Sequence, residues 1–292
     1  MFNQKEEIFK KWLEEINCEF TEKNIPHKQR PFEALRRLAI DKGISTYIGS
    51  ELSNMIFDWF KKNTKDGVHN IGTLFSSTYF YDCEFWELEI FVFFGTVRID
   101  PFNSLTDMPP VIKKKLSTDP IMKVDYLRHW ADCFDFSSGF HSIRSSKKLN
   151  SFGQDFMNAG FEELNSAVTL LRTNRLNPRA IMDSRMAVEM FFKSYAALHN
   201  SLTEKEAKRI SHCLEEGLEK MIYLTGQQKL EELRPKLAVY PEISNRYKAQ
   251  TLERTDLWTG FHTAQTIGAI VTRQFSDYNI LSDIEKEIKK RT

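Results

Sequence analysis

The chain has 292 residues and an ordinary globular composition, 41% hydrophobic and 28% charged. Its 41 basic residues balance 40 acidic residues, which excludes a strongly basic nucleic-acid-binding protein and a protein with an acidic tail. At roughly 100–200 residues per domain, the length predicts two domains.

The cysteines and the apolar segments indicate the compartment. No two cysteines have the CxxC spacing of zinc ribbons or thioredoxins, which favours reduced thiols; they are Cys18, Cys83, Cys133 and Cys213. The first residues, MFNQKEEIFKKW, lack the apolar core of a secretory signal. The longest apolar stretch, near Ile90–Gly95, is far shorter than the ~20 residues of a membrane span. We therefore expect a soluble cytoplasmic protein without a membrane partner.

The first hundred residues predict helices followed by a small sheet. Apolar residues at helical spacing indicate a helix around residues 8–16, a second that Pro31 opens and Gly43 ends, and a third over about 49–62. Aromatic and β-branched residues then predict strands over Thr73–Tyr81 and Glu84–Phe94, with Asp82 at the turn. Thr96–Ile99 is a possible third strand, so residues 67–100 predict an antiparallel meander.

The middle of the chain contains the predicted domain boundary. A short helix is expected after Pro110 and a longer one over Asp119–Phe136. Residues 137–151, SSGFHSIRSSKKLNS, are rich in Ser and in basic residues, a composition typical of a linker. We therefore expect an N-terminal α+β region of unknown family over residues 1–150 and a second domain over residues 151–292.

The second half predicts an antiparallel bundle of four or five helices. Apolar stripes indicate helices over about 156–171, 179–200 and 203–225, and a short helix ending near Pro235. Gly226 is expected to end the third helix, which a capping box opens at Thr203. The last predicted helix, from about Thr255 to Phe275, repeats its apolar residues in steps of four and three.

Four segments of this half, in this order, resemble the HEPN domain family over about residues 152–276. They are DSRMAVEMFFKSYAALH with Ala187, Glu189 and Lys193; KRISHCLEEGLEKM with His212, Leu214 and Leu218; ISNRYKAQT with Arg246 and Tyr247; and GFHTAQTIGAIVTRQF with Ala264 and Ala269. The resemblance implies a four-helix bundle that commonly forms homodimers. It also implies either a metal-independent ribonuclease or a module that binds a nucleotide, RNA or a protein partner. Neither needs a cofactor.

The ribonuclease members carry an Arg, four to six residues and then a His near the start of the last helix. Here Arg254 and His262 are separated by seven residues, and on a continuous helix they point roughly 80° apart. Arg209 and His212 are separated by only two. His212, His262 and Arg254 are therefore candidate catalytic residues that depart from the family pattern. The leading hypothesis is a binding module, and the alternatives are a ribonuclease of a toxin or defence system and an adaptor that docks through the aromatic sheet.

Two groups of residues are candidates for binding. Arg185, Glu189 and Lys193 are four apart and share one helix face, which suits either a polar groove or a surface ion-pair ladder. Arg246 and Tyr247 follow a loop, where the guanidinium can hold a phosphate or close the loop.

Other patterns carry less chemistry. His129, Asp132 and Cys133 form the chain's His–Asp–Cys cluster, which has too few ligands for a metal site. A dimer is also expected because the second and last helices of the bundle carry many apolar residues, among them Met190, Phe192, Trp258 and Ile270.

Overall fold

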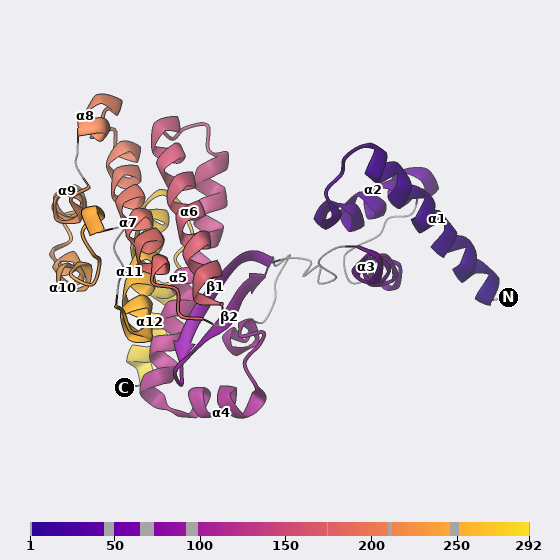
Figure 1. The fold of residues 1–292 in the computed structure, drawn as a ribbon, viewed down its shortest axis with the longest axis horizontal. Helices are drawn as coiled ribbons and strands as arrows, with labels where there is room; N and C mark the ends of the chain where they lie inside the picture. Colours follow the sequence, from indigo (N-terminus) through magenta and orange to yellow (C-terminus); the bar gives the residue numbers. More distant parts are fainter. Residues whose placement is uncertain are drawn as a thin grey trace. The chain divides into compact units, whose positions relative to one another are not determined.

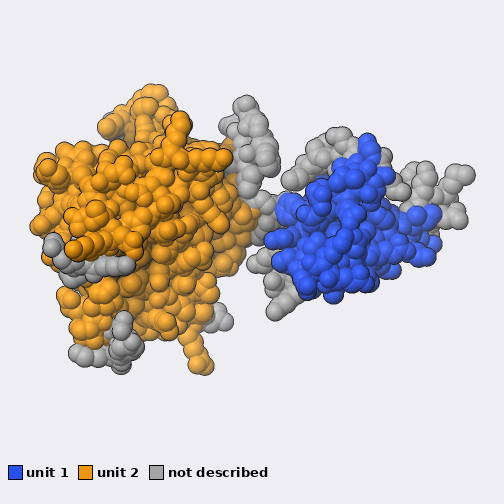
Figure 2. All heavy atoms as spheres, turned by 90° about the horizontal axis from the view of Figure 1, so that it is seen from above, with its two compact units in different colours: residues 1–71 blue, residues 72–292 orange. Residues whose placement is uncertain are grey.

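The chain divides into two compact units, Met1–Ile71 and Gly72–Thr292 (Figure 2). The computed structural model describes residues 2–43, 50–64, 73–91, 99–173, 175–209, 212–245 and 251–291. The division lies near residue 71, whereas the sequence analysis placed the domain boundary near residue 150. The predicted N-terminal region therefore contributes its second half, with the sheet, to the larger unit.

The first unit is helical. It contains α1 (Phe2–Glu22), a short 3₁₀ helix (His27–Gln29), α2 (Arg30–Lys42) and α3 (Glu51–Asn63). As predicted, Gly43 ends α2 with a left-handed backbone, φ 63°. Ser50 caps α3 by accepting a hydrogen bond from the Ser53 amide. The unit has its own apolar core, formed by Leu13, Ile16, Phe20, Ala34, Leu38, Ile56 and Phe60.

The second unit combines a two-stranded sheet with a set of helices (Figure 1). Its elements are β1 (Thr73–Tyr81), β2 (Glu84–Phe91), η2 (Pro101–Ser104), α4 (Pro110–Thr118), α5 (Pro120–Ser145), α6 (Ser151–Leu171), α7 (Arg179–Leu198), α8 (Glu204–Arg209), α9 (Leu214–Thr225), η3 (Gln228–Leu233), α10 (Arg234–Leu237), η4 (Ile243–Asn245), α11 (Arg254–Phe275) and α12 (Ile280–Arg291). The described part of the chain is thus mostly helical with a small antiparallel sheet, as the predicted α+β class requires.

The two strands form a hairpin with the predicted turn. Phe75 pairs with Ile90 and Tyr81 with Glu84 in antiparallel register. Asp82 and Cys83 both have positive φ, 54° and 66°, as a type I′ turn needs. Residues 92–98, which include the end of the predicted second strand and most of the third, lie outside the described residues.

The predicted linker is largely helix. Helix α5 runs without interruption to Ser145, so residues 137–145 continue its apolar stripe instead of connecting two domains. Phe136, Phe140 and Ile143 are buried on this stripe, and the Phe140 ring stacks on Phe161 of α6 with centroids 4.0 Å apart. The small residues serve close packing, because a Cβ added at Gly139 would lie 2.6 Å from the Thr272 Cβ of α11.

The core of the second unit lies where α5, α6, α7 and α11 pack together, with the hairpin against α5 and α6. The Phe136 ring of α5 contacts the rings of both Phe161 of α6 and Phe191 of α7. The backbones of α6 and α7 approach closely, because a Cβ at Gly160 would lie 2.5 Å from the Phe191 ring. Among the described residues, no helix has the length and apolar character needed to cross a bilayer.

Two features of the helices were not predicted. The predicted helix over 203–225 is two helices, α8 and α9, which leaves His212 in the connection between them. The capping box at Thr203 and the left-handed Gly226 at the end of α9 are as predicted. The chain also ends in helix α12, which packs against α5.

The apolar residues expected at a dimer surface are not a free patch. Phe192 is 4% exposed and lies close to Gly217 of α9, where an added Cβ would be 2.5 Å from the ring. Trp258 and Ile270 are partly buried against the main core, and the Trp258 ring contacts Tyr79. Packing within one chain therefore accounts for Phe192, Trp258 and Ile270.

Candidate functional site

The conspicuous polar cluster of the second unit surrounds Glu189 in the middle of α7. Its Oε1 accepts a hydrogen bond of 2.7 Å from Lys193 Nζ, and its Oε2 lies 2.8 Å from His212 Nδ1. Arg185 Nη1 is 3.7 Å from the same Oε2. The structure thus brings together four of the residues singled out in the sequence, three of them at helical spacing and one from the connection before α9.

Burial distinguishes this cluster from a surface ion-pair ladder. Arg185 and Glu189 are each 4% exposed, and the Lys193 side chain is 12% exposed. Arg185 Nη2 also donates to the backbone oxygen of His212 at 2.6 Å, so the guanidinium fixes the connection between α8 and α9. Buried charges are tolerated only when they are paired, and here one carboxylate serves three basic groups.

His212 is oriented by the cluster yet reaches the surface. Its Nδ1 contacts the buried Glu189 carboxylate, while 52% of the side chain is exposed. An imidazole that a carboxylate holds through one nitrogen presents the other nitrogen in a fixed direction. His212 is therefore the catalytic candidate whose geometry suits proton transfer.

A pocket of about 130 Å³ opens beside the cluster, between α7 and α9. Glu189 and Lys193 line it from α7, Lys220 from α9, and Phe192 and Leu202 supply apolar walls. The first residues of α9 also border the pocket, and the N-cap residue Cys213 makes no side-chain hydrogen bond to the first turn. The pocket therefore combines a positive helix end with cationic side chains and an apolar wall.

Arg254 and His262, two further predicted site residues, contact residues outside this cluster. Arg254 Nη1 is 2.8 Å from the Glu84 carboxylate at the hairpin. The His262 ring packs against His129 and Trp258, with centroid separations of 5.2 Å and 5.0 Å. Arg254 and His262 therefore have separate partners. Arg246 and Tyr247 lie outside the residues that the structure describes.

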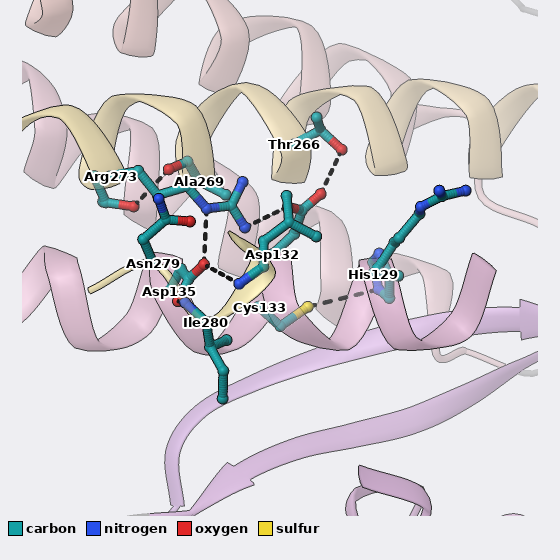
Figure 3. Close-up of polar contacts among 12 residues, drawn as sticks. His129, Asp132, Cys133, Asp135, Thr266, Ala269, Arg273, Asn279 and Ile280 are labelled. Atoms are coloured by element: carbon teal, nitrogen blue, oxygen red, sulfur yellow. Dashed lines mark hydrogen bonds and ion pairs between the residues drawn. The ribbon is translucent and has the colours of Figure 1, made fainter. Parts of the chain in front are cut away.

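The His–Asp–Cys cluster of α5 is divided between two environments (Figure 3). His129 Nε2 lies 2.9 Å from the Thr78 oxygen of β1 and 3.6 Å from Cys133 Sγ, within the core. Asp132 faces α11, where it accepts hydrogen bonds from Thr266 and Arg273. Among the described residues, no three His, Cys, Asp or Glu side chains are arranged to hold a metal ion.

Arg273 of α11 joins three helices through two carboxylates of α5 (Figure 3). Its Nη2 is 2.7 Å from Asp132, and its Nε is 2.7 Å from Asp135. Asp135 also accepts hydrogen bonds from the Ile280 and Leu281 amides, so it caps the start of α12. Burial raises the pKa of Asp132, and the bonds from Arg273 and Thr266 oppose that shift. The three charges fix α5, α11 and α12 together, a structural role.

The aromatic side of the hairpin is interior. Phe75 contacts Phe136 of α5 and Phe161 of α6 through its ring, and Leu88 and Ile90 are buried. Helices α5 and α6 therefore cover this side of the hairpin, whereas Phe80, Phe85 and Trp86 are only partly buried.

Sequence reasoning missed Lys220 and the start of α9 as parts of the pocket. The HEPN-like pattern placed Leu214 and Leu218 on the apolar side of α9, and both are buried. Gly217 and Lys220 follow on the same helix, and Gly217 allows the Phe192 ring to approach. A glycine inside an otherwise regular helical stripe was the available signal for this close approach.

Comparison of the chain with protein-family models, with curated proteins and with solved structures finds no match. The resemblance to HEPN domains therefore stays a prediction from the sequence.

Proposed function

We propose that the second unit is a HEPN-like binding module whose pocket between α7 and α9 holds the phosphate of a nucleotide or of RNA. Support comes from the charges around the pocket. The buried Glu189 carboxylate is already paired with Arg185, Lys193 and His212. With Lys220, these basic groups outnumber the two carboxylates of the pocket lining, Glu189 and Glu216.

Lys220 is the observation that carries this proposal. Its Nζ donates to the Ser201 backbone oxygen at 2.7 Å, and among the described residues it has no carboxylate partner. A lysine on a pocket wall whose charge is not neutralised is suited to an anionic ligand. Glu216 adds one negative charge to the pocket lining.

The start of α9 adds to this preference. The first amides of a helix lack intrahelical acceptors, and together with the helix dipole they favour a bound phosphate. Helix α9 begins at the pocket with Cys213 and Leu214 on its lining. The apolar side formed by Phe192 and Leu202 suits a base or ribose next to the phosphate.

We also propose that the protein forms a homodimer, as the resemblance to HEPN domains implies. This proposal rests on the resemblance alone, because Phe192 and Trp258 pack within one chain. Light scattering at tens of micromolar protein tests it, and a monomer mass would refute it.

The binding proposal is tested with Lys220→Gln and the matched control Lys229→Gln, an exposed lysine on the neighbouring η3. Titrations use adenosine monophosphate, adenosine triphosphate and a short single-stranded RNA. Loss of one charge-assisted hydrogen bond of about 1.5–3 kcal/mol lowers the affinity roughly tenfold to a hundredfold. Lys229→Gln should leave it unchanged.

The ligand series separates the two phosphate sources. A nucleotide site binds the mononucleotides as tightly as RNA, whereas an RNA site prefers the oligomer and weakens steeply with added salt. A folded protein that binds none of the three at millimolar concentration contradicts the proposal and leaves a protein partner as the remaining form of the module.

A second candidate function, a metal-independent ribonuclease, is favoured by the geometry of His212. An imidazole oriented by Glu189 and half exposed can accept the proton of a ribose 2′-hydroxyl, and a neighbouring cation can hold the phosphate charge. The test is cleavage of total RNA by the wild type, His212→Ala and His262→Ala. Cleavage lost only in His212→Ala supports this function, and RNA left intact by the wild type refutes it.

A further inference from the structure

The second unit has another cavity, of about 540 Å³, away from the Glu189 cluster in sequence and contacts. It is lined by the end of β1 and the hairpin turn, by α4 and α5, and by the first half of α11. Its volume is within the roughly 300–1,000 Å³ of small-molecule sites. Of the described candidate catalytic and binding residues, His262 borders it.

The cavity has aromatic walls. Tyr79 and Phe80 come from β1, and Trp258 comes from α11. The Trp258 ring lies edge-on to Tyr79 at 5.4 Å and 6.4 Å from Phe80, measured between centroids. The rings hold one another in place, so the wall is formed before any ligand binds. Such a wall suits a flat apolar group or a cation over a ring face.

The charges on the lining leave one carboxylate unpaired. Lys115 Nζ lies 3.5 Å from Asp82, and Arg128 Nε lies 2.6 Å from Glu285 of α12. These two pairs neutralise both basic side chains of the lining. Asp125 has no ion-pair partner among the described residues, so the cavity keeps a net negative charge at that position.

Two further polar groups of the lining, His262 and Tyr79, are uncharged near neutral pH. Burial, with a contribution from Lys236, lowers the pKa of His262 to about 4, so its imidazole is neutral at pH 7. Burial and the Asp125 charge raise the pKa of Tyr79, so its hydroxyl stays protonated. Both groups can hydrogen-bond a ligand, and neither repels a cation.

We propose that this cavity binds a small organic ammonium ion, with its positive group on Asp125 and its aromatic or aliphatic part against Tyr79 and Trp258. The site is independent of the phosphate proposal, because the two cavities share no lining residue. A cationic ligand for one and an anionic ligand for the other also make the two proposals separable by experiment.

The test compares three probes of one shape by calorimetry: phenethylammonium, 2-phenylethanol and 3-phenylpropionate. The wild type should bind the ammonium at least tenfold more tightly than the alcohol and should bind the carboxylate least. Asp125→Asn should remove this preference, because the variant lacks the unpaired charge on the exposed rim. The matched control is Asp277→Asn, an exposed carboxylate outside the lining, which should bind as the wild type does.

Three results would overturn the proposal: no binding of any probe at millimolar concentration, tighter binding of the carboxylate, or an ammonium preference that survives Asp125→Asn. Lys220→Gln should leave ammonium binding unchanged, because Lys220 lines the other pocket. The ammonium measurement therefore stands even if the phosphate proposal fails.

Discussion

Removal of the Asp135 side chain should strongly destabilise the second unit. Its side chain is fully buried and binds Arg273 Nε at 2.7 Å and the Ile280 amide at 2.7 Å. Asp135→Ala leaves part of the Arg273 charge unpaired in the core, and breaking a buried pair costs about 3–5 kcal/mol. About 1 kcal/mol of that is typical for a lost helix cap. Since domain stabilities are about 5–15 kcal/mol, the loss is a large fraction of the total.

The free energy of unfolding, measured by urea titration, gives the cost directly. Asp283→Ala is the matched control: its carboxylate is 75% exposed and pairs with Lys286, so the expected change is about 0–1 kcal/mol. Asp135→Asn separates the two contributions, because the amide oxygen can still accept from Ile280 while the charge is lost. It should therefore cost less than Asp135→Ala.

Hydrogen exchange locates the effect. Amides of α12 should exchange faster in Asp135→Ala, because their cap and the bridge to α11 are both lost. Equal losses of stability in the Asp135 and Asp283 variants would refute the assignment of Asp135 and Arg273 as the junction of α5, α11 and α12.

Three further outcomes are expected. Burial lowers the pKa of His262 to about 4 in the folded protein, against 6.5 in the unfolded chain. The free energy of unfolding should therefore keep this contribution above pH 6.5 and lose about 1–3 kcal/mol as the pH falls toward 4. His262→Gln should flatten this part of the profile of unfolding free energy against pH. Gly160→Ala should cost about 1–3 kcal/mol in thermal unfolding, because the Phe191 ring has no room to move away. Residues 72–292 expressed alone should unfold cooperatively, whereas residues 151–292 should not, since they lack Phe136 and Phe140 of α5.

Helices with regularly spaced apolar residues were predictable, because a helix that buries one face needs apolar residues at that spacing. The region over 203–225 shows the limit, since its stripe continues across the break at His212. The division of the chain was not predictable from composition. Serines and a glycine in residues 137–145 indicate a linker, yet Phe136, Phe140 and Ile143 keep helical spacing through the same segment. Periodicity was the more reliable signal there, because a linker has no reason to repeat large apolar residues.

The polar clusters also differ in how far the sequence predicts them. Arg185, Glu189 and Lys193 are neighbours on any helix, so their proximity follows from spacing. His212 comes from the connection before α9, and tertiary packing brings it to Glu189. Asp135 and Arg273 are 138 residues apart and belong to no motif, so only tertiary packing pairs them.

The aromatic cavity is a further case, because its wall needs β1 and α11 side by side. Asp125 stands four residues before His129 in the first half of α5, where a solvated carboxylate is the usual interpretation of the sequence. Asp125 is a candidate binding residue because the two basic side chains of the lining pair with other carboxylates. Lys115 pairs with Asp82, and Arg128 pairs with Glu285. Removing Glu285 should therefore free Arg128 to neutralise Asp125, and Glu285→Gln should weaken the binding of phenethylammonium although the aromatic wall is unchanged.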